Sequence, residues 1–311
     1  MPKIGYLLPT RERVMSGEPE TGPMLALAER AEALGYDSLW VGDSITARPR
    51  HEPISLLAAV AARTRRPELG TAVLLPALRN PVVLAHQIAT LDRISEGRFI
   101  LGVGIASDVP NIRSEFVACG VPFEKRVGRM LEGLRLMRAL WSGNPVTWDG
   151  LWKIDAGTVG PTPHRPGGPP IWIGGMVKAA IERTGRLFDG WFPNGPDAPY
   201  WAENWGQVRD FARRAGRDPA ELTGAIYLTL TLDDDADRAD RRMNAYLENY
   251  YGRPAAEMRA RQSTYAGPAA GAADYLAAYA EAGASHIMLR FAGDHERHLE
   301  AGAQLRQRLG W

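Results

Sequence analysis

Residues Gly70–Ala106, GTAVLLPALRNPVVLAHQIATLDRISEGRFILGVGIA, contain the pattern that decides the fold. The β-branched and apolar run Gly70–Leu75 predicts a short strand. A helix is predicted next, because Asn80 suits the N-cap position and Pro81 suits the first helical position. The nearly all-apolar run Phe99–Val103 then predicts a second strand. A strand without alternation is buried on both faces, which is typical of a parallel sheet covered by helices.

The same succession of strand and helix recurs along the whole chain. Further strands are predicted at Lys3–Leu8, Asp37–Val41, Pro170–Gly175, Gly190–Pro193, Gly224–Leu232 and His286–Phe291. Eight strands that alternate with helices predict an α/β fold of the (β/α)8 TIM-barrel type, and a doubly wound open sheet is the alternative.

The domain organisation is predicted from the lengths of the connecting segments. The charged, mostly helical segment Asp233–Gly271 is longer than one helix requires, so we predict an insertion late in the barrel. Trp148–Thr158 is predicted as a small hairpin. Since no linker of domain-boundary length interrupts the pattern, residues 1–311 are predicted to form one domain.

Composition excludes several classes of function. The 37 basic and 36 acidic residues give a net charge of +1, which supplies no field for binding nucleic acid or an anionic membrane. The single cysteine, Cys119, permits no internal disulfide, which favours a reducing compartment. The N-terminal residues lack the features of a signal peptide, and no apolar run reaches spanning length. We therefore expect a soluble, cytoplasmic protein.

Three groups at predicted strand ends are candidates for the site, because ligands of such folds bind at the C-terminal ends of strands. Asp43 follows the second strand and is a candidate to orient a cofactor or move a proton, or else caps a turn. Gly102-Val103-Gly104 permits a flat ligand to approach the backbone, or forms a tight turn. Gly174-Gly175-Met176 precedes a helix, where backbone amides suit a phosphate, although a plain strand-to-helix turn explains it equally well.

Several other chemistries lack their sequence patterns. There is no GxSxG nucleophile elbow and no HExxH or Cys/His zinc spacing, so neither an α/β-hydrolase nor a metal site is predicted. GVGIAS, beginning at Gly102, lacks the third glycine of a dinucleotide fingerprint. Arg79 is a candidate contact for a phosphate or substrate carboxylate, or a structural ion-pair partner.

Taken together, several blocks resemble the bacterial luciferase-like flavin oxidoreductases over nearly the whole chain. The matching blocks are KIGYLLP, AERAEALGYDSLWVGD, RNPVVLAHQIATLDRISEGRFILGVG, FEKRVGRMLEGLRLMRALW and PPIWIGG…GRLFDGWFP. The resemblance implies a TIM barrel with an insertion region. It also implies FMN, usually in the reduced form supplied by a separate reductase, or the deazaflavin coenzyme F-420.

The resemblance also implies roles for matched positions. A non-proline cis peptide bond, placed at Ala72-Val73, forms a bulge behind the flavin ring. The implied cofactor-binding residues are Asp43, Ala72, Val73, Val103, Gly104, Ile105, Phe123, Arg126, Gly174, Gly175 and Met176. Of these, Gly174, Gly175 and Met176 would bind the phosphate, and Asp43 is the tentative catalytic residue.

One departure from the family affects the choice of cofactor. Many deazaflavin-using relatives have Asp-His where this chain has Asp43-Ser44, so a usual proton-handling group is missing. We therefore favour a monooxygenase that uses reduced FMN and oxygen on a small organic substrate. Hydride transfer with coenzyme F-420 is the alternative, and a non-catalytic flavin-binding protein is a third hypothesis. A homodimer is expected by resemblance, and the substrate is expected to be set by the loops Arg11–Thr21 and Thr46–Pro53 and by the insertion, which is a candidate lid.

Overall fold

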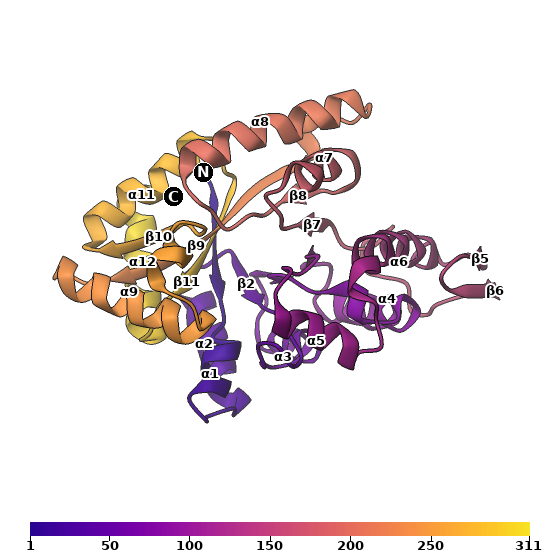
Figure 1. The fold of residues 1–311 in the computed structure, drawn as a ribbon, viewed down its shortest axis with the longest axis horizontal. Coiled ribbons are helices and arrows are strands. Elements are labelled where there is room, and N and C mark those ends of the chain that lie inside the picture. The colour runs from indigo at the N-terminus through magenta and orange to yellow at the C-terminus, as the bar shows by residue number, and fades with distance from the viewer.

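The computed structural model describes all 311 residues, and its main sheet is a closed barrel of eight parallel strands (Figure 1). The barrel order is β1–β2–β3–β4–β7–β8–β9–β11, and the pairing of β11 with β1 completes the ring. Their bounds are β1 (Lys3–Leu7), β2 (Ser38–Val41), β3 (Glu68–Thr71), β4 (Phe99–Val103), β7 (Ile171–Ile173), β8 (Gly190–Trp191), β9 (Thr223–Leu232) and β11 (His286–Phe291). The predicted TIM barrel is confirmed, because the pairing of β8 with β9 leaves no open doubly wound sheet.

Helices surround this barrel. They are α1 (Thr10–Met15), α2 (Thr21–Ala33), α3 (Pro53–Arg63), α4 (Pro81–Ile94), α5 (Pro110–Ala118), α6 (Arg126–Leu140), α7 (Lys178–Leu187), α8 (Ala198–Arg214), α9 (Ala236–Tyr251), α10 (Ala255–Arg259), α11 (Ala269–Glu281) and α12 (His295–Arg308). In Figure 1, α9, α11 and α12 lie on one side, and α4, α5 and α6 lie on the other. The hairpin of β5 (Val146–Asp149) and β6 (Lys153–Gly157) projects beside α6. None of these helices has the length and apolar character needed to cross a membrane.

The segment that decides the fold forms the predicted elements, with one shift. Helix α4 begins as expected, because the Asn80 side chain accepts a hydrogen bond from the Val82 amide at 2.9 Å. The third strand, predicted over Gly70–Leu75, instead ends at Thr71. The chain turns away at the cis Ala72-Val73 bond, and Leu74 returns only as a single bridge to Val103.

Three further elements lie where the sequence suggested loops or helix. Helices α1 and α5 are short, and no side chain caps either N-terminus, so they gave no clear start signal. The segment predicted as an insertion, Asp233–Gly271, holds α9, α10 and also β10 (Thr264–Gly267). Strand β10 pairs in parallel with the end of β9, so part of this segment extends the barrel sheet.

Large aromatic side chains fill the inside of the barrel. The Trp40 ring lies 5.4 Å from the Trp172 ring and 5.0 Å from the Phe192 ring, measured between centroids. Glycine at position 70 makes this possible, because a Cβ there would stand 2.1 Å from Trp40 Cζ3. Ala72 and Val73 pack against this cluster, so it forms the floor beneath the barrel mouth.

A buried histidine is joined to the same cluster. Trp40 Nε1 donates to Ser38 Oγ at 2.7 Å, and Ser38 Oγ lies 2.7 Å from His286 Nε2. Since the Ser38 hydroxyl accepts from Trp40, its own proton is available to His286 Nε2, which suits a neutral imidazole. Burial, with a smaller effect of the Lys3 charge, lowers the pKa of His286 to about 3.

This histidine predicts a loss of stability in mild acid. An unfolded histidine binds a proton below pH of about 6.5, whereas the folded His286 does not until about pH 3. The folded state therefore loses about 1.4 kcal/mol per pH unit from this group as the pH falls through that window. Urea unfolding between pH 7.5 and 5 measures this slope. His286→Gln should flatten it, whereas the exposed His86→Gln on α4 should leave it unchanged; equal slopes in all three proteins would contradict the assignment.

Candidate functional site

The C-terminal ends of the barrel strands meet at one mouth, where Val73 packs against the ends of β4 and β7. A Cβ at Gly104 would lie 2.4 Å from Val73 Cγ2, and one at Gly174 would lie 3.5 Å from Val73 Cγ1. The two glycines, at the ends of β4 and β7, therefore leave the room that the Val73 side chain fills. Val103 links the same strands, since its carbonyl accepts from the Gly174 amide at 3.0 Å. The bulge at Ala72-Val73 is half-buried and is the predicted support for a flat ring.

The Gly174-Gly175-Met176 loop presents backbone amides at the start of α7. The Gly175 carbonyl accepts from Trp191 Nε1 at 2.9 Å, and the Met176 carbonyl accepts from the Tyr200 hydroxyl at 2.8 Å. The C=O and N–H of a trans peptide point in opposite directions, so the amides of Met176 and Val177 face away from Trp191 and Tyr200. No side chain caps this helix. Uncapped amides at a helix N-terminus suit a phosphate group.

The tyrosine that holds this loop gives a direct test. Tyr200→Phe removes the hydroxyl that anchors the Met176 carbonyl but keeps the ring. We expect cofactor binding to weaken about five- to tenfold, since such a hydrogen bond contributes roughly 1 kcal/mol. Fluorescence titration with the cofactor measures the effect. Tyr265→Phe is a matched control, because the Tyr265 hydroxyl donates to Pro268 at a distant turn; an equal loss in both variants would show that the loop is not involved.

Asp43 is fully engaged by other groups. Arg79 binds both carboxylate oxygens, with Nη1 2.6 Å from Oδ2 and Nη2 3.0 Å from Oδ1. The Leu75 amide also donates to Oδ2 at 2.9 Å. Burial alone would lower the pKa of Arg79, but the hydrogen bond and charge of Asp43 raise it. This geometry favours Asp43 as a residue that positions the turn after β3, and its tentative catalytic role stays a prediction.

Ser44, which stands where many deazaflavin-using relatives are expected to carry histidine, is held by a buried carboxylate. Glu115 on α5 is fully buried, and its Oε1 accepts from Ser44 Oγ at 2.8 Å. The amides of Ile45, Thr46 and Ala47 donate to the same oxygen. Glu115 thus fixes the loop after β2. Sequence reasoning did not single it out, because a glutamate on a short amphipathic helix carries no local signal.

The remaining predicted cofactor residues lie on the β4 side of the barrel. Ile105 is half-buried directly after β4. Phe123 and Arg126 lie together at the start of α6, where the Arg126 guanidinium stacks 3.7 Å from the Phe123 ring centroid. Arg126 Nε is buried without a hydrogen-bond partner, so it remains able to donate. The structure thus groups Val73, Gly104 and Gly174, whereas Phe123 and Arg126 form a separate pair.

A buried arginine on β11 lies among four tyrosines, and sequence reasoning missed this group. Arg290 is 1% exposed, and its guanidinium lies 4.9–5.5 Å from the ring centroids of Tyr227, Tyr246, Tyr250 and Tyr251. It also donates to Thr229 Oγ1 and Gln262 Oε1, at 2.8 and 3.0 Å. No carboxylate lies within ion-pair distance of it. The signal in the sequence was an arginine inside the otherwise apolar strand HIMLRF.

Comparison with known proteins agrees with this architecture. Residues 1–310 match the family model described as luciferase-like monooxygenase. The chain belongs to this family. The luciferase-like protein is an oxidoreductase, as the resemblance implied. It is 34% identical over 243 residues to an F420-dependent glucose-6-phosphate dehydrogenase of Nakamurella multipartita, a match that covers 74% of this chain and 70% of the relative. It is 31% identical to a 5,10-methylenetetrahydromethanopterin reductase of Methanolobus tindarius, over 68% of this chain and 62% of the relative.

Solved structures show the same fold at lower identity. The monooxygenase RslO1 from Streptomyces bottropensis superposes with a TM-score of 0.84 at 24% identity, covering 99% of this chain and 100% of that one. An F420-dependent secondary alcohol dehydrogenase, in complex with an F420-acetone adduct, also gives 0.84, at 21% identity and 99% coverage of both chains. A monooxygenase and an F420-dependent dehydrogenase therefore share this fold.

Proposed function

We propose that this luciferase-like protein is a coenzyme F-420-dependent oxidoreductase that transfers hydride between the deazaflavin and a small organic substrate. The similarity to relatives named as F420-dependent dehydrogenases and to a methanopterin reductase carries the proposal. These findings favour the F-420 alternative over the FMN-dependent monooxygenase that the sequence first suggested. Bound deazaflavin would supply the position that accepts or donates hydride.

The residues at the mouth fit such a cofactor. The amides of Met176 and Val177 would hold a phosphate. Their peptide planes are fixed, because Trp191 and Tyr200 donate hydrogen bonds to the Gly175 and Met176 carbonyl groups of the same peptides. Val73, seated between Gly104 and Gly174, would support one face of the ring system. The ion pair of Asp43 with Arg79 fixes the turn that carries Val73, through the Leu75 amide.

A proton must leave or reach the substrate when a hydride is transferred, and Tyr251 is the candidate to hold it. Burial alone would raise the pKa of Tyr251, but the charge of Arg290 and the hydrogen bond that Arg290 donates lower this pKa below its usual value. Arg290 Nη1 donates to the Tyr251 hydroxyl at 2.8 Å. Tyr251 Oη is therefore able to release a proton more readily than an ordinary tyrosine.

Anaerobic titration with coenzyme F-420, FMN and reduced FMN tests the proposal. Trp40 and Trp172 lie in the floor of the mouth, so quenching of tryptophan fluorescence reports binding there. We expect coenzyme F-420 to bind at least tenfold more tightly than either form of FMN. Selective binding of reduced FMN, followed by oxygen-dependent turnover with a flavin reductase, would establish the monooxygenase instead. Tight binding of oxidised FMN without turnover would indicate a flavin-binding protein.

A further inference from the structure

Four arginines converge on the tyrosines of the barrel mouth. Besides Arg290, the guanidinium groups of Arg11 and Arg50 lie 4.9 and 6.0 Å from the Tyr250 ring centroid. Arg48 lies 5.1 Å from the Tyr251 ring centroid. We call Arg11, Arg48, Arg50 and Arg290 the arginine cluster. Its members come from α1, the loop after β2 and the end of β11, which are adjacent in the barrel order.

The positive charges of the arginine cluster are not neutralised by carboxylates of the protein. None of the four has a carboxylate within 4.0 Å, although most other arginines of the chain do. Nε and Nη1 of Arg11 are buried without any hydrogen-bond partner. The nearby carboxylate of Glu12 accepts from the Tyr246 hydroxyl at 2.5 Å. Four guanidinium groups thus face a single carboxyl group, that of Glu12.

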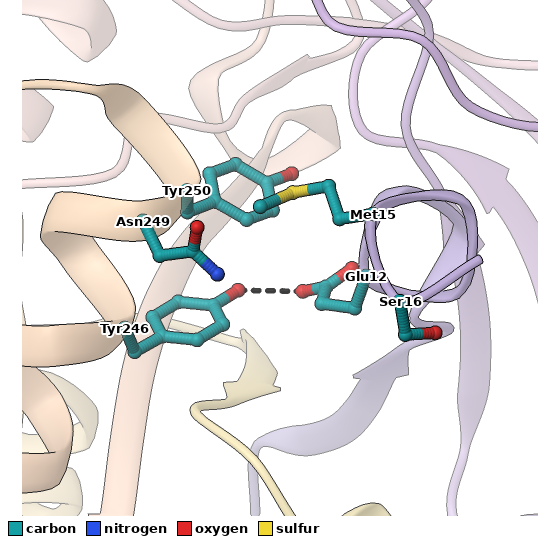
Figure 2. Close-up of a pocket in the computed structure, with 6 residues that line it drawn as sticks. All are labelled: Glu12, Met15, Ser16, Tyr246, Asn249 and Tyr250. Atoms are coloured by element: carbon teal, nitrogen blue, oxygen red, sulfur yellow. Dashed lines mark hydrogen bonds between the residues drawn. The ribbon is translucent and has the colours of Figure 1, made fainter.

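A pocket lies beside this cluster, separated from its arginines by the Tyr250 ring. It has a volume of about 150 Å³ and lies between α1 and α9, lined by Glu12, Met15, Ser16, Tyr246, Asn249 and Tyr250. Figure 2 shows Tyr246 and Tyr250 projecting from α9 toward Glu12 and Met15 on α1. Tyr250 belongs to both the pocket and the cluster. Its ring lines the pocket and makes cation–π contacts with Arg11, Arg50 and Arg290.

The cluster also borders the bulge after β3. A Cβ at Gly42 would lie 2.2 Å from Arg50 Nη1 and 3.6 Å from the Ala72 carbonyl oxygen, so Arg50 reaches the bulge after β3. The Gly174-Gly175-Met176 loop after β7 lies across the barrel, because β7 is four strands from β1 in the ring of eight. An anion held by the cluster would therefore sit opposite the cofactor phosphate.

We infer that the arginine cluster binds a carboxylate or phosphate group of the substrate, so that the substrate class is an anionic small molecule whose apolar part packs on the tyrosine rings. The inference rests on the proposed function, since it places this group beside the ring that Val73 would support. Guanidinium groups recognise carboxylates and phosphates through paired N–H donors, and Arg11 retains two such donors without partners.

Calorimetric titration of the cofactor-free protein with inorganic phosphate, and separately with benzoate, tests the inference at constant ionic strength. The variant is Arg11→Gln/Arg48→Gln, because neither side chain has an ion pair or hydrogen-bond partner to lose, and circular dichroism checks its fold. Arg13→Gln is the control: it lies on the same helix but pairs with Glu18. We expect at least one probe to bind the wild type and the control equally, and to bind the double variant at least tenfold more weakly.

Three results would overturn the inference: no binding of either probe to the wild type, equal binding to the double variant, or loss of anion binding once coenzyme F-420 saturates the protein. The last would assign the cluster to an anionic part of the cofactor. Stronger binding of phosphate or of benzoate identifies which anion the substrate carries. Because the comparison of the wild type with the double variant uses cofactor-free protein and no turnover, its outcome is separate from that of the proposed function.

Discussion

Replacing Asp43 with alanine is expected to lower the free energy of unfolding by about 3 kcal/mol, since it removes the bidentate partner of a buried guanidinium and leaves only the more exposed Glu52 at 3.5 Å. The Asp43 side chain is 2% exposed and that of Arg79 is 16% exposed, so water cannot replace the lost contacts fully. The Leu75 amide loses its acceptor in the same change. Because Leu75 follows the bulge, cofactor binding should weaken together with stability. Urea unfolding and cofactor titration at pH 7 measure the two effects.

Two comparisons separate a positioning role of Asp43 from a catalytic one. Arg79→Ala should produce a loss of similar size, because it leaves Asp43 buried and unpaired. Asp149→Asn, which breaks an ion pair whose side chains are 82% and 83% exposed, should leave stability unchanged. If Asp43 also transfers a proton, Asp43→Asn would lower turnover by far more than its losses of stability and cofactor affinity explain.

Gly104→Ala is expected to reduce cofactor affinity at least tenfold and to destabilise the fold by about 1–3 kcal/mol, the usual cost of overpacking. The new Cβ would stand 2.4 Å from Val73 Cγ2, so one of the two must move. Valine is stiff at χ1 and the bulge is packed from below by the aromatic floor, so the side chain has little room to turn. The displaced Val73 would then intrude on the space of the ring.

A double variant distinguishes the steric clash at position 104 from the contact of Val73 with the cofactor ring. Val73→Ala in the Gly104→Ala background removes the clashing methyl group, so stability should recover while cofactor affinity stays low. Gly128→Ala on α6 is the control, because a Cβ there meets nothing within 4 Å. Recovery of affinity together with stability would show that Val73 does not contact the cofactor.

The strand pattern was predictable because a barrel strand is buried on both faces and carries a continuous apolar run. Phe99–Val103 and His286–Phe291 were predicted with their observed bounds. The third strand was predicted too long, since the apolar run Val73–Leu75 continues after the chain has left the sheet. Strand β10 was missed because TYAG is short and lies within the segment predicted as a mostly helical insertion.

The site was predictable only where its residues lie close together in the sequence. The resemblance placed a cis bond at Ala72-Val73, and the structure has it there. The arginine cluster assembles from positions 11, 48, 50 and 290, which no spacing rule connects. Ser44 was taken as evidence against coenzyme F-420, whereas the relatives favour that cofactor. Its hydroxyl is bound to Glu115, so its presence reflects how this loop is held rather than which cofactor binds.

The surroundings of Arg290 also limit how this enzyme can be recombined with its relatives. The arginine belongs to a barrel strand, but three of its four aromatic neighbours, Tyr246, Tyr250 and Tyr251, belong to α9. A chimaera that takes residues 233–271 from another member would leave a buried cation facing foreign side chains. Residues 233–271 and strand β11 must therefore be exchanged together. Libraries that exchange them separately should yield mostly misfolded proteins.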